Sequence, residues 1–319
     1  MTMVIGKALQ DRLVVITGGS GFFGRHVAQA LLDQGARLRI ASRNPEKAFA
    51  LKPLANLGQI QFARCDVTNP DSVRAAMLGA DAAVNLVGAF DGDLMQLIAG
   101  GAENVARAAA EAGAAAMVHV SAIGADLNSE AEYARAKAQS ELDVLAAFPA
   151  ATILRPSLLF GEDDGLLALF AGMISTLAVL PVFAPHAPLQ MLFVDDAADA
   201  VAAALTDPDT HGGKTYEIAG DEAITMLELH RRIAAAQGRK RIFVEMPDTV
   251  SGIFAALPGT PMGRDQWILL KQGNVPSGKY PGIHKLGIDP RPLSLFLDRW
   301  MVKYRTHGRF TRRMPGGGA

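Results

Sequence analysis

A glycine-rich turn follows an apolar run near the start of the chain, in the stretch VVITGGSGFFGRH at residues 14–26. Four glycines fall between Gly18 and Gly24, and apolar residues at helical spacing come next. Glycine permits a tight turn and lets a pyrophosphate approach the backbone, while the free N–H groups at a helix start attract phosphate. Since a strand precedes the glycines and a helix follows them, the stretch predicts a dinucleotide cradle.

Short apolar segments recur through the first half of the chain and alternate with segments of helical periodicity. The expected strands cover residues 13–17, 37–42, 59–65, 81–88, 116–122 and 151–156. Strands that alternate with helices of this length form βαβ units, and right-handed crossovers place the helices on both faces of a parallel sheet. The pattern predicts an α/β fold with a doubly wound parallel sheet of the Rossmann type.

The regular alternation ends near residue 156, although strand-like pieces recur at 189–194, 214–219 and 241–247. We therefore expect an NAD(P)-binding Rossmann domain over 1–155 and a smaller C-terminal α/β lobe over 156–314, partly interleaved with the first. A disordered tail is expected over 315–319. Ser129 with Glu132, and Thr225 with Glu228, predict capping boxes at two helix starts.

Composition narrows the classes of function. The net charge of −1 gives no reason to expect nucleic-acid binding. The single cysteine, Cys65, excludes an intrachain disulfide and a cysteine-based zinc site. No cluster of side chains has metal-ligand spacing, so no metal site is expected. A reducing, cytoplasmic compartment is the expected location.

The end of the second expected strand bears on which nucleotide fits the cradle. An NAD site places Asp or Glu there to bond the ribose 2′-hydroxyl. Here Ser42 and Arg43 occupy that place, with Lys47 one turn later. A guanidinium suits a 2′-phosphate through bidentate, charge-assisted bonds. These residues favour NADP(H), with NAD(H) as the alternative.

Motifs spread over nearly the whole chain resemble short-chain dehydrogenase/reductases of the extended or atypical type, which include the NAD-dependent epimerase/dehydratases. They are TGGSGFFG at 17–24, CDVT at 65–68, NLVG at 85–88, YARAK at 133–137, LRPSLLFG at 154–161 and FVDDAADAV at 193–201. Within that superfamily, HVSAIGAD followed by YARAK and the uncharged FAGMISTLAVLPVF resembles one branch. That branch is the NADPH-binding accessory subunit of respiratory complex I with its bacterial relatives.

The resemblance extends the candidate cofactor site beyond the glycine loop. It implies that Asp66 and Val67 meet the adenine ring and that residues 85–88 line the adenosine half. The candidate cofactor-binding residues are Thr17, Gly18, Gly19, Ser20, Gly21, Phe22, Phe23, Gly24, Ser42, Arg43, Lys47, Asp66, Val67, Asn85, Leu86, Val87, Gly88, Ser121, Lys137, Arg155 and Pro156.

Tyr133 and Lys137 are four residues apart and share a helix face. The resemblance implies that the lysine holds the nicotinamide ribose and lowers the pKa of the tyrosine, which then acts as a general acid or base toward a carbonyl or carbinol. Ser121, at the end of the fifth expected strand, completes the candidate catalytic set.

The remaining family positions are altered. Ser121 stands in SAIG, so Ala122 or Ile123 would occupy the place of the catalytic hydroxyl if the serine is early. Ile98 stands where the family has its structural asparagine, and an isoleucine cannot relay a proton to the lysine. The interpretation favoured is an accessory protein with a tightly held cofactor and weak or no turnover.

The alternative is an active enzyme, either an NADPH-dependent reductase or an epimerase/dehydratase of nucleotide sugars. A nucleotide-sugar pyrophosphate needs cations or helix ends, but residues 156–213 contain no lysine and no arginine. The segment is rich in aliphatic side chains, so an apolar ligand or partner fits it better. The substrate stays unknown.

Two further segments indicate a surface for docking. Residues 165–185 carry no charge, yet Pro181 and Pro185 interrupt them, which favours a buried or interfacial helix over a membrane span. Residues 299–313 are basic with interleaved aromatics, as in a solvated tail or in a segment that docks on an acidic partner or anionic lipid. The expected partners are respiratory complex I or a membrane surface, with peripheral attachment at the inner face.

Overall fold

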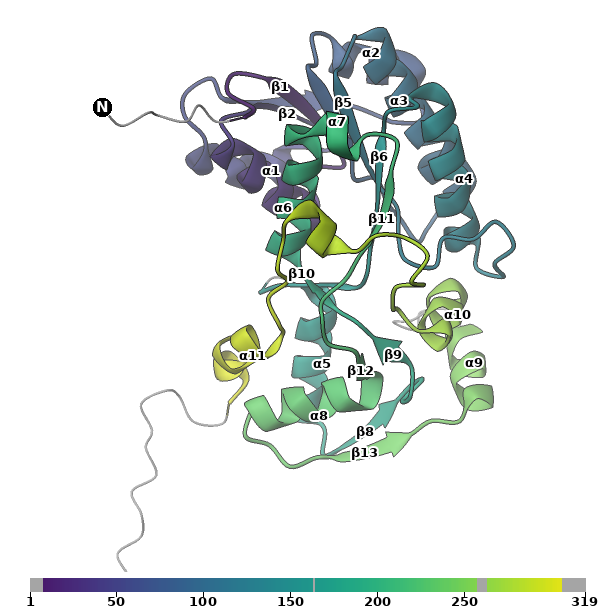
Figure 1. Ribbon diagram of the computed structural model, residues 1–319. Helices are drawn as coiled ribbons and strands as arrows, with labels where there is room; N and C mark the ends of the chain where they lie inside the picture. Colours follow the sequence, from purple (N-terminus) through teal and green to yellow (C-terminus); the bar gives the residue numbers. More distant parts are fainter. Residues whose placement is uncertain (1–7, 163, 257–262, 306–319) are drawn as a thin grey trace, which may run out of the picture.

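The computed structural model describes residues 8–162, 164–256 and 263–305 (Figure 1). The tail expected over 315–319 lies outside the described residues, as does the segment 306–314. The described chain forms a larger lobe built on one parallel sheet and a smaller lobe below it in Figure 1.

Seven parallel strands form the sheet in the described part of the chain, in the order β3-β2-β1-β4-β5-β6-β11. They are β1 (Leu13–Thr17), β2 (Arg37–Ser42), β3 (Ile60–Arg64), β4 (Ala82–Asn85), β5 (Ala116–Val120), β6 (Thr152–Pro156) and β11 (Thr215–Ile218). Every residue of β1 is buried, because parallel strands in such a sheet are covered on both faces. The prediction of a doubly wound Rossmann sheet is confirmed.

Helices cover both faces of this sheet. The α-helices are α1 (Phe22–Asp33), α2 (Pro70–Met77), α3 (Gly101–Glu111), α4 (Glu132–Ala147), α6 (Val194–Thr206) and the short α7 (Pro208–His211); η1 (Pro45–Leu54) is a 3₁₀ segment and η2 (Met95–Gly100) a π segment. Val14 and Ile16 pack with α1 and α6, whereas Val15 packs with α2 and α3 on the opposite face. This alternation follows from the two-residue period of a strand.

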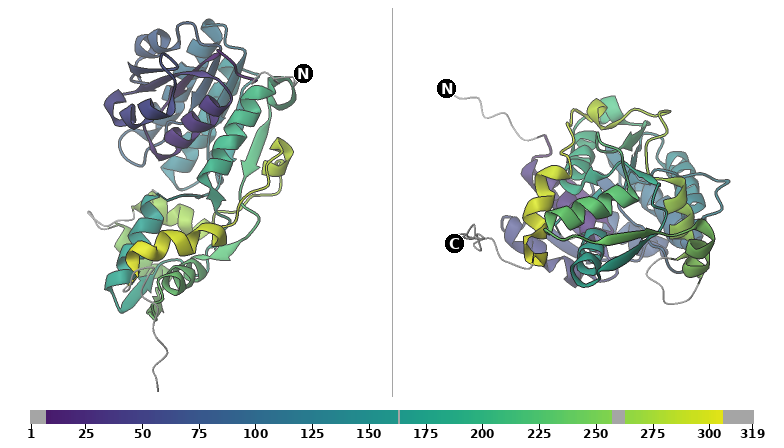
Figure 2. Two further views of the ribbon diagram at one scale, coloured as in Figure 1. Left: turned by 90° about the vertical axis from the view of Figure 1, so that its left-hand side faces the viewer. Right: turned by 90° about the horizontal axis from the view of Figure 1, so that it is seen from below.

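The C-terminal lobe lies apart from the Rossmann sheet (Figure 2). It has a core of its own, which includes Phe160 and Phe193. Its helices are α5 (Gly165–Thr176), α8 (Met226–Ala236), α9 (Asp248–Ala256), α10 (Arg264–Gln272) and α11 (Ser294–Trp300), with the 3₁₀ turn η4 (Met301–Tyr304). The 3₁₀ turn η3 (Ile283–Leu286) packs instead on the Rossmann lobe, beside α6 and β11. The strands of the C-terminal lobe pair two by two: β7 (Leu159–Phe160) with β10 (Leu192–Phe193), β9 (Pro188–Leu189) with β12 (Ile224–Thr225), and β8 (Val179–Val182) with β13 (Ile242–Glu245). Between these elements the chain returns to the Rossmann sheet, where α6 covers α1 and β11 pairs with β6.

The uncharged run 165–185 differs from the helix expected there. Helix α5 ends at Thr176, and the strand β8 follows it. The helix buries Leu167, Ala171 and Ile174 in the lobe core. No helix in the described ranges is long and apolar enough to cross a bilayer.

The two expected helix caps behave differently. Thr225 caps α8 by accepting a hydrogen bond from the Glu228 amide at 3.1 Å. The capping box expected at Ser129 is wrong, because α4 begins later and its N-cap residue is Ala131, whose side chain cannot accept a hydrogen bond.

Candidate nucleotide-binding site

A cavity of about 340 Å³ opens where β1, β2 and β4 end and α1 begins. The carboxyl ends of strands in an open α/β sheet are the usual place for a ligand. Among the predicted residues, Gly18, Ser20, Gly21, Phe22, Phe23, Gly24, Ser42, Arg43, Lys47, Val67, Leu86, Val87 and Gly88 line it. Ala41, Asn44, Cys65 and Leu97 also line it and were missed; Asn44 adjoins Arg43 in sequence, but no pattern singles out Leu97.

The glycines of the loop are required for different physical reasons. Gly18 has a φ of +74°, which side chains disfavour, and a Cβ on Gly24 would lie 2.5 Å from the Gly19 Cα. Those positions need glycine for the fold itself. A Cβ on Gly21 would approach only the Gly18 carbonyl oxygen, at 3.5 Å. Gly21 lines the cavity, so its bare backbone is open to a ligand.

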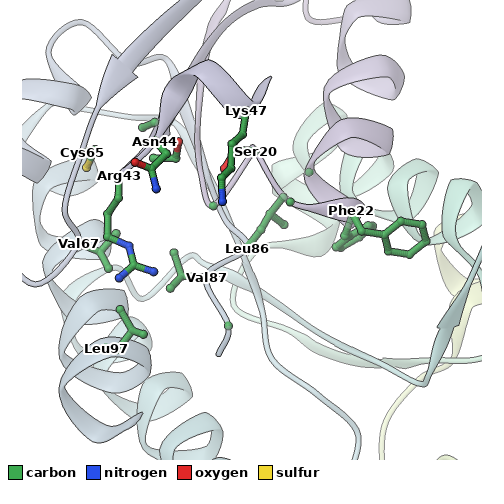
Figure 3. Close-up of a pocket in the computed structure, with 17 residues that line it drawn as sticks. Ser20, Phe22, Arg43, Asn44, Lys47, Cys65, Val67, Leu86, Val87 and Leu97 are labelled. Atoms are coloured by element: carbon green, nitrogen blue, oxygen red, sulfur yellow. The ribbon is translucent and has the colours of Figure 1, made fainter. Parts of the chain in front are cut away.

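Two cations at the end of β2 extend into the cavity. Figure 3 shows the Arg43 and Lys47 side chains reaching into the space near Leu86 and Val87, while the Phe22 ring points away from both cations. Neither cation forms a hydrogen bond or ion pair with another of the described residues. Asp66, which follows β3, is an acid that interacts with Arg43. Hydrogen bonds from Thr68 lower the pKa of Asp66, and the charge of Arg43 lowers it to a smaller extent. The region is thus suited to an anion.

Several predicted residues lie behind the cavity wall and shape it. The Asn85 Oδ1 atom accepts hydrogen bonds from Thr17 Oγ1 at 2.8 Å and from the Val87 amide at 3.2 Å. It thereby fixes the loop 85–88 against the glycine loop. Gly19 packs against Ile16 and Ile40, and a Cβ there would lie 3.1 Å from both side chains.

A buried polar chain continues from Asn85 toward α4. Asn85 Nδ2 lies 3.1 Å from His119 Nδ1, and His119 Nε2 lies 2.9 Å from Ser140 Oγ. Burial lowers the pKa of His119 well below its ordinary value, and the charge of Lys137 acts in the same direction. A neutral imidazole with both nitrogens engaged therefore joins β4, β5 and α4.

Lys137 is buried beside the cavity rather than lining it. Its Nζ donates hydrogen bonds to the carbonyl oxygens of Val87 at 3.1 Å and Val120 at 2.9 Å. Burial lowers the pKa of Lys137 to about 8, although Glu141 opposes this shift. The lysine thus braces the wall loop against β5.

Tyr133 is covered by an aromatic side chain. The Phe90 ring stacks on it with centroids 4.5 Å apart and an interplanar angle of 19°. Lys137 Nζ lies 5.9 Å from the centre of the tyrosine ring. The resemblance implies a lowered tyrosine pKa, whereas in this structure burial raises the pKa of Tyr133 to about 12. No pattern in the sequence predicts that Phe90 stacks on Tyr133.

The rest of the predicted catalytic set is not assembled. Ser121 follows β5, and its buried hydroxyl has no hydrogen-bond partner among the described residues. Among the described residues, the side chains of Ser121, Tyr133 and Lys137 form no hydrogen bond with one another. Ile98 is 1% exposed and packs in a small apolar cluster that includes Tyr133. An apolar contact therefore replaces the proton relay that an asparagine would provide.

The helix that carries Tyr133 and Lys137 is capped from the other lobe. The backbone amide of Tyr133 donates to Asp265 Oδ2 at 2.8 Å, and Asp265 lies in the first turn of α10. This carboxylate was missed, since 132 residues separate the two in sequence. A carboxylate at a helix N-terminus satisfies an orphan amide and interacts favourably with the helix dipole.

Arg155 and Pro156 lie on β6, outside the cavity lining. The Arg155 guanidinium donates to both Glu141 carboxylate oxygens, at 2.8 and 2.7 Å, and stacks on Tyr280 at 4.6 Å. Glu217 lies 3.7 Å from it on β11. These partners hold the Arg155 guanidinium between α4 and β11, and Pro156 is buried at the strand end.

Taken together, the doubly wound parallel sheet, the glycine loop at the start of α1 and the cavity at the strand ends define an NAD(P)-binding protein of the short-chain dehydrogenase/reductase class. A family model described as NAD(P)H-binding matches residues 18–171. The chain belongs to the atypical short-chain dehydrogenase/reductases related to a subunit of complex I.

Two relatives and one solved structure are similar to this chain. The chain is 29% identical to subunit 9 of the alpha subcomplex of mitochondrial NADH dehydrogenase (ubiquinone) from Rattus norvegicus, over 92% of this chain and 81% of that protein. It is 30% identical to a ceramide reductase from Caulobacter vibrioides, over 74% of each. An NADPH-dependent quinone oxidoreductase from Escherichia coli, solved with NADPH, superposes with a TM-score of 0.73 at 22% identity, over 90% of this chain and 99% of that chain. At 22% identity, the similarity to the quinone oxidoreductase shows only a shared fold.

Proposed function

We propose that this chain holds NADP(H) in the cavity, in preference to NAD(H), with weak or no turnover, as an accessory protein of the complex I type. One observation carries the proposal. The cavity at the glycine loop is open and positively charged, whereas Tyr133 beside it is covered by Phe90 and has a raised pKa.

The residues present fit a phosphorylated dinucleotide. The bare backbone at Gly21 and the free amides at the start of α1 would receive the pyrophosphate. Arg43 and Lys47 would bind the 2′-phosphate, and Val67 with Leu97 would face the adenine. When bound, the nucleotide would supply a hydride for reduction.

We expect weak turnover because the side chains that would transfer protons have an unsuitable pKa or are held in other hydrogen bonds. A tyrosine with a pKa near 12 is a poor acid at neutral pH, and Lys137 is engaged with two carbonyl oxygens. Ser121 donates no hydrogen bond toward either residue, and Ile98 closes the relay position.

Association with complex I is proposed from the relatives. The match to the rat mitochondrial subunit covers 92% of this chain, so both lobes are shared. An attachment of this kind would place the chain peripherally at the inner face of a membrane.

Native mass spectrometry of the purified full-length chain tests the proposal. We expect a mass increment of one NADP(H), and calorimetry of the emptied protein should show tighter binding of NADPH than of NADH. An increment of NAD(H), or equal affinity for the two nucleotides, would contradict it. Co-purification with respiratory subunits then tests the partner.

A reductase of an apolar carbonyl compound is the second candidate. The retained pair of Tyr133 and Lys137 favours it, and the lack of cations over 156–213 favours it over nucleotide-sugar chemistry. The ceramide reductase relative gives the kind of lipid to try. NADPH consumption with a panel of apolar ketones, abolished by Tyr133→Phe, would establish this function in place of the first.

A further inference from the structure

Strands β8 and β13 form a parallel pair at the end of the C-terminal lobe farthest from the Rossmann sheet (Figure 1). In their register Ile242 lies opposite Val179, and Val244 lies opposite Pro181. Because side chains alternate along a strand, these four share one face. The other face, with Leu180 and Val182, is buried in the lobe core.

The shared outer face is apolar and open. Ile242 is 64% exposed, Val179 51% and Val244 44%, and Leu177, just before β8, adds a further 44% exposed side chain. A contiguous apolar surface on a soluble lobe marks a place that contacts a partner or a membrane. The exposed side chains of this face therefore come from the middle of the uncharged run, at Leu177 and Val179, and from a strand some 60 residues later.

Cations border this face at the start of β13. Arg239, Lys240 and Arg241 directly precede Ile242. Arg241 Nε donates to the Ile174 carbonyl at 2.7 Å and an Arg239 nitrogen donates to the Tyr304 carbonyl at 3.2 Å, so both guanidinium groups are held in place. Lys240 is exposed, and its ammonium group has no hydrogen bond or ion pair with the described residues.

We infer that the face formed by Val179, Pro181, Ile242 and Val244, with its border at residues 239–241, docks on an anionic lipid surface. Aliphatic side chains that enter the headgroup layer beside cations that meet lipid phosphate are the chemistry of peripheral membrane binding. Protein hot spots differ, since they are rich in Trp, Tyr and Arg that fill pockets. This face offers aliphatic side chains on a strand pair.

The docking surface and the cofactor cavity lie in different lobes, so the inference stands apart from the proposed nucleotide binding. A chain attached by the β8–β13 end would direct its Rossmann sheet away from the bilayer (Figure 2).

Co-sedimentation of the full chain with vesicles tests the inference. We expect binding to vesicles of phosphatidylcholine with phosphatidylglycerol, little binding to phosphatidylcholine alone, and loss of binding at high salt. Lys240→Glu should weaken binding at least about fivefold, given roughly 1 kcal/mol per cation near an anionic surface. The double variant Ile242→Ser with Val244→Ser should weaken it about tenfold or more, because less apolar area enters the headgroup layer.

Matched controls lie elsewhere on the surface. Leu78, 70% exposed on the Rossmann lobe, gives Leu78→Ser, and the exposed Lys285 gives Lys285→Glu; neither should change vesicle binding. NADPH affinity should be equal in all variants, which reports that each one is folded. If the double variant fails to fold, the charge reversal at Lys240 still decides the matter.

Three outcomes would overturn the inference. They are no binding to anionic vesicles at low salt, equal loss in the control variants, and binding to solubilised respiratory complexes with none to vesicles. The last would assign the face to a protein partner. A chain that binds vesicles but retains no NADP(H) would contradict the proposed function alone.

Discussion

The two sides of the candidate site differ in how they are built. The cavity side uses short, local segments: a glycine loop, the two cations after β2 and the loop after β4. The tyrosine side depends on distant contacts, since Phe90 covers Tyr133 and Asp265 caps its helix from the other lobe. The first side is open and charged, whereas on the second side an aromatic ring covers the tyrosine and the lysine is buried.

This difference teaches what each activity requires. Binding a dinucleotide needs bare backbone and fixed cations, which a few adjacent residues supply. Proton transfer needs several groups at hydrogen-bond distance with matched pKa values, and here the pKa of Tyr133 is raised to about 12. A chain can therefore keep the first property while losing the second.

Gly24→Ala should have the largest effect on the cavity side. A Cβ there would lie 2.5 Å from the Gly19 Cα, and backbone cannot move aside as a side chain can. We expect the free energy of unfolding to fall by roughly 4 kcal/mol or more, measured by urea denaturation. Gly172→Ala in α5, where a Cβ meets nothing within 4 Å, is the control and should be neutral or stabilising. A stable Gly24→Ala variant would break the account of the loop.

Gly21→Val should separate binding from folding. A Cβ at Gly21 meets only the Gly18 oxygen at 3.5 Å, so the chain should fold, while the side chain fills the approach to the cavity. We expect NADPH affinity to fall by more than about 100-fold, or roughly 3 kcal/mol, in calorimetry. Nucleotide retained by a folded Gly21→Val protein would count against the cradle.

Burial of Lys137 on the tyrosine side should make the stability of the protein depend on pH. Its folded-state pKa is lowered to about 8 from an ordinary value of 10.5, so the unfolded chain binds more protons between those pH values. The contribution of Lys137 to stability therefore rises with pH through that window, by on the order of 3 kcal/mol at most. Below it the lysine is charged in both states and the full cost of burial remains.

Urea denaturation of the wild type and of Lys137→Met at several pH values from 7 to 10 measures this term. The stability of the wild type relative to the variant should increase as the pH rises. A constant difference would mean that the lysine is solvated and that the tyrosine side is open.

Arg43→Ala should remove the preference for NADPH. Loss of one bidentate contact with the 2′-phosphate should cost about 1.5–3 kcal/mol, or about 10- to 100-fold in NADPH affinity, with little change for NADH. Calorimetry with both nucleotides measures it. Lys285→Ala, which removes an exposed cation outside the cavity lining, is the control and should leave both affinities unchanged. A preference that survives Arg43→Ala would place recognition elsewhere.

Asp265→Ala should have the smallest effect, on the tyrosine side alone. Loss of the cap should cost about 1 kcal/mol and speed hydrogen exchange in the first turn of α4, while NADPH affinity stays nearly the same. Asp265→Asn keeps an acceptor oxygen and should lose less. A large loss of NADPH affinity in Asp265→Ala would show that the two sides are coupled more tightly than their contacts suggest.

The features predicted correctly from the sequence are those whose physical cause is local. Apolar runs of five to eight residues between amphipathic segments predicted the main sheet, because the periodicity of a strand or a helix can be seen within about a dozen residues. The glycine spacing predicted the turn before α1, since backbone conformation and close approach constrain individual positions.

Tertiary structure decided what distant segments do together. It replaced the cap expected at Ser129 by Asp265, laid Phe90 over Tyr133, and committed Arg155 to Glu141. It also paired Val179 with Ile242 into one exposed face from segments that look unrelated in sequence. Such contacts depend on how whole elements pack, and packing is set by the complete chain. The sequence alone thus determined the nucleotide cradle. The tertiary structure decided how far Tyr133 and Lys137 are covered by other side chains.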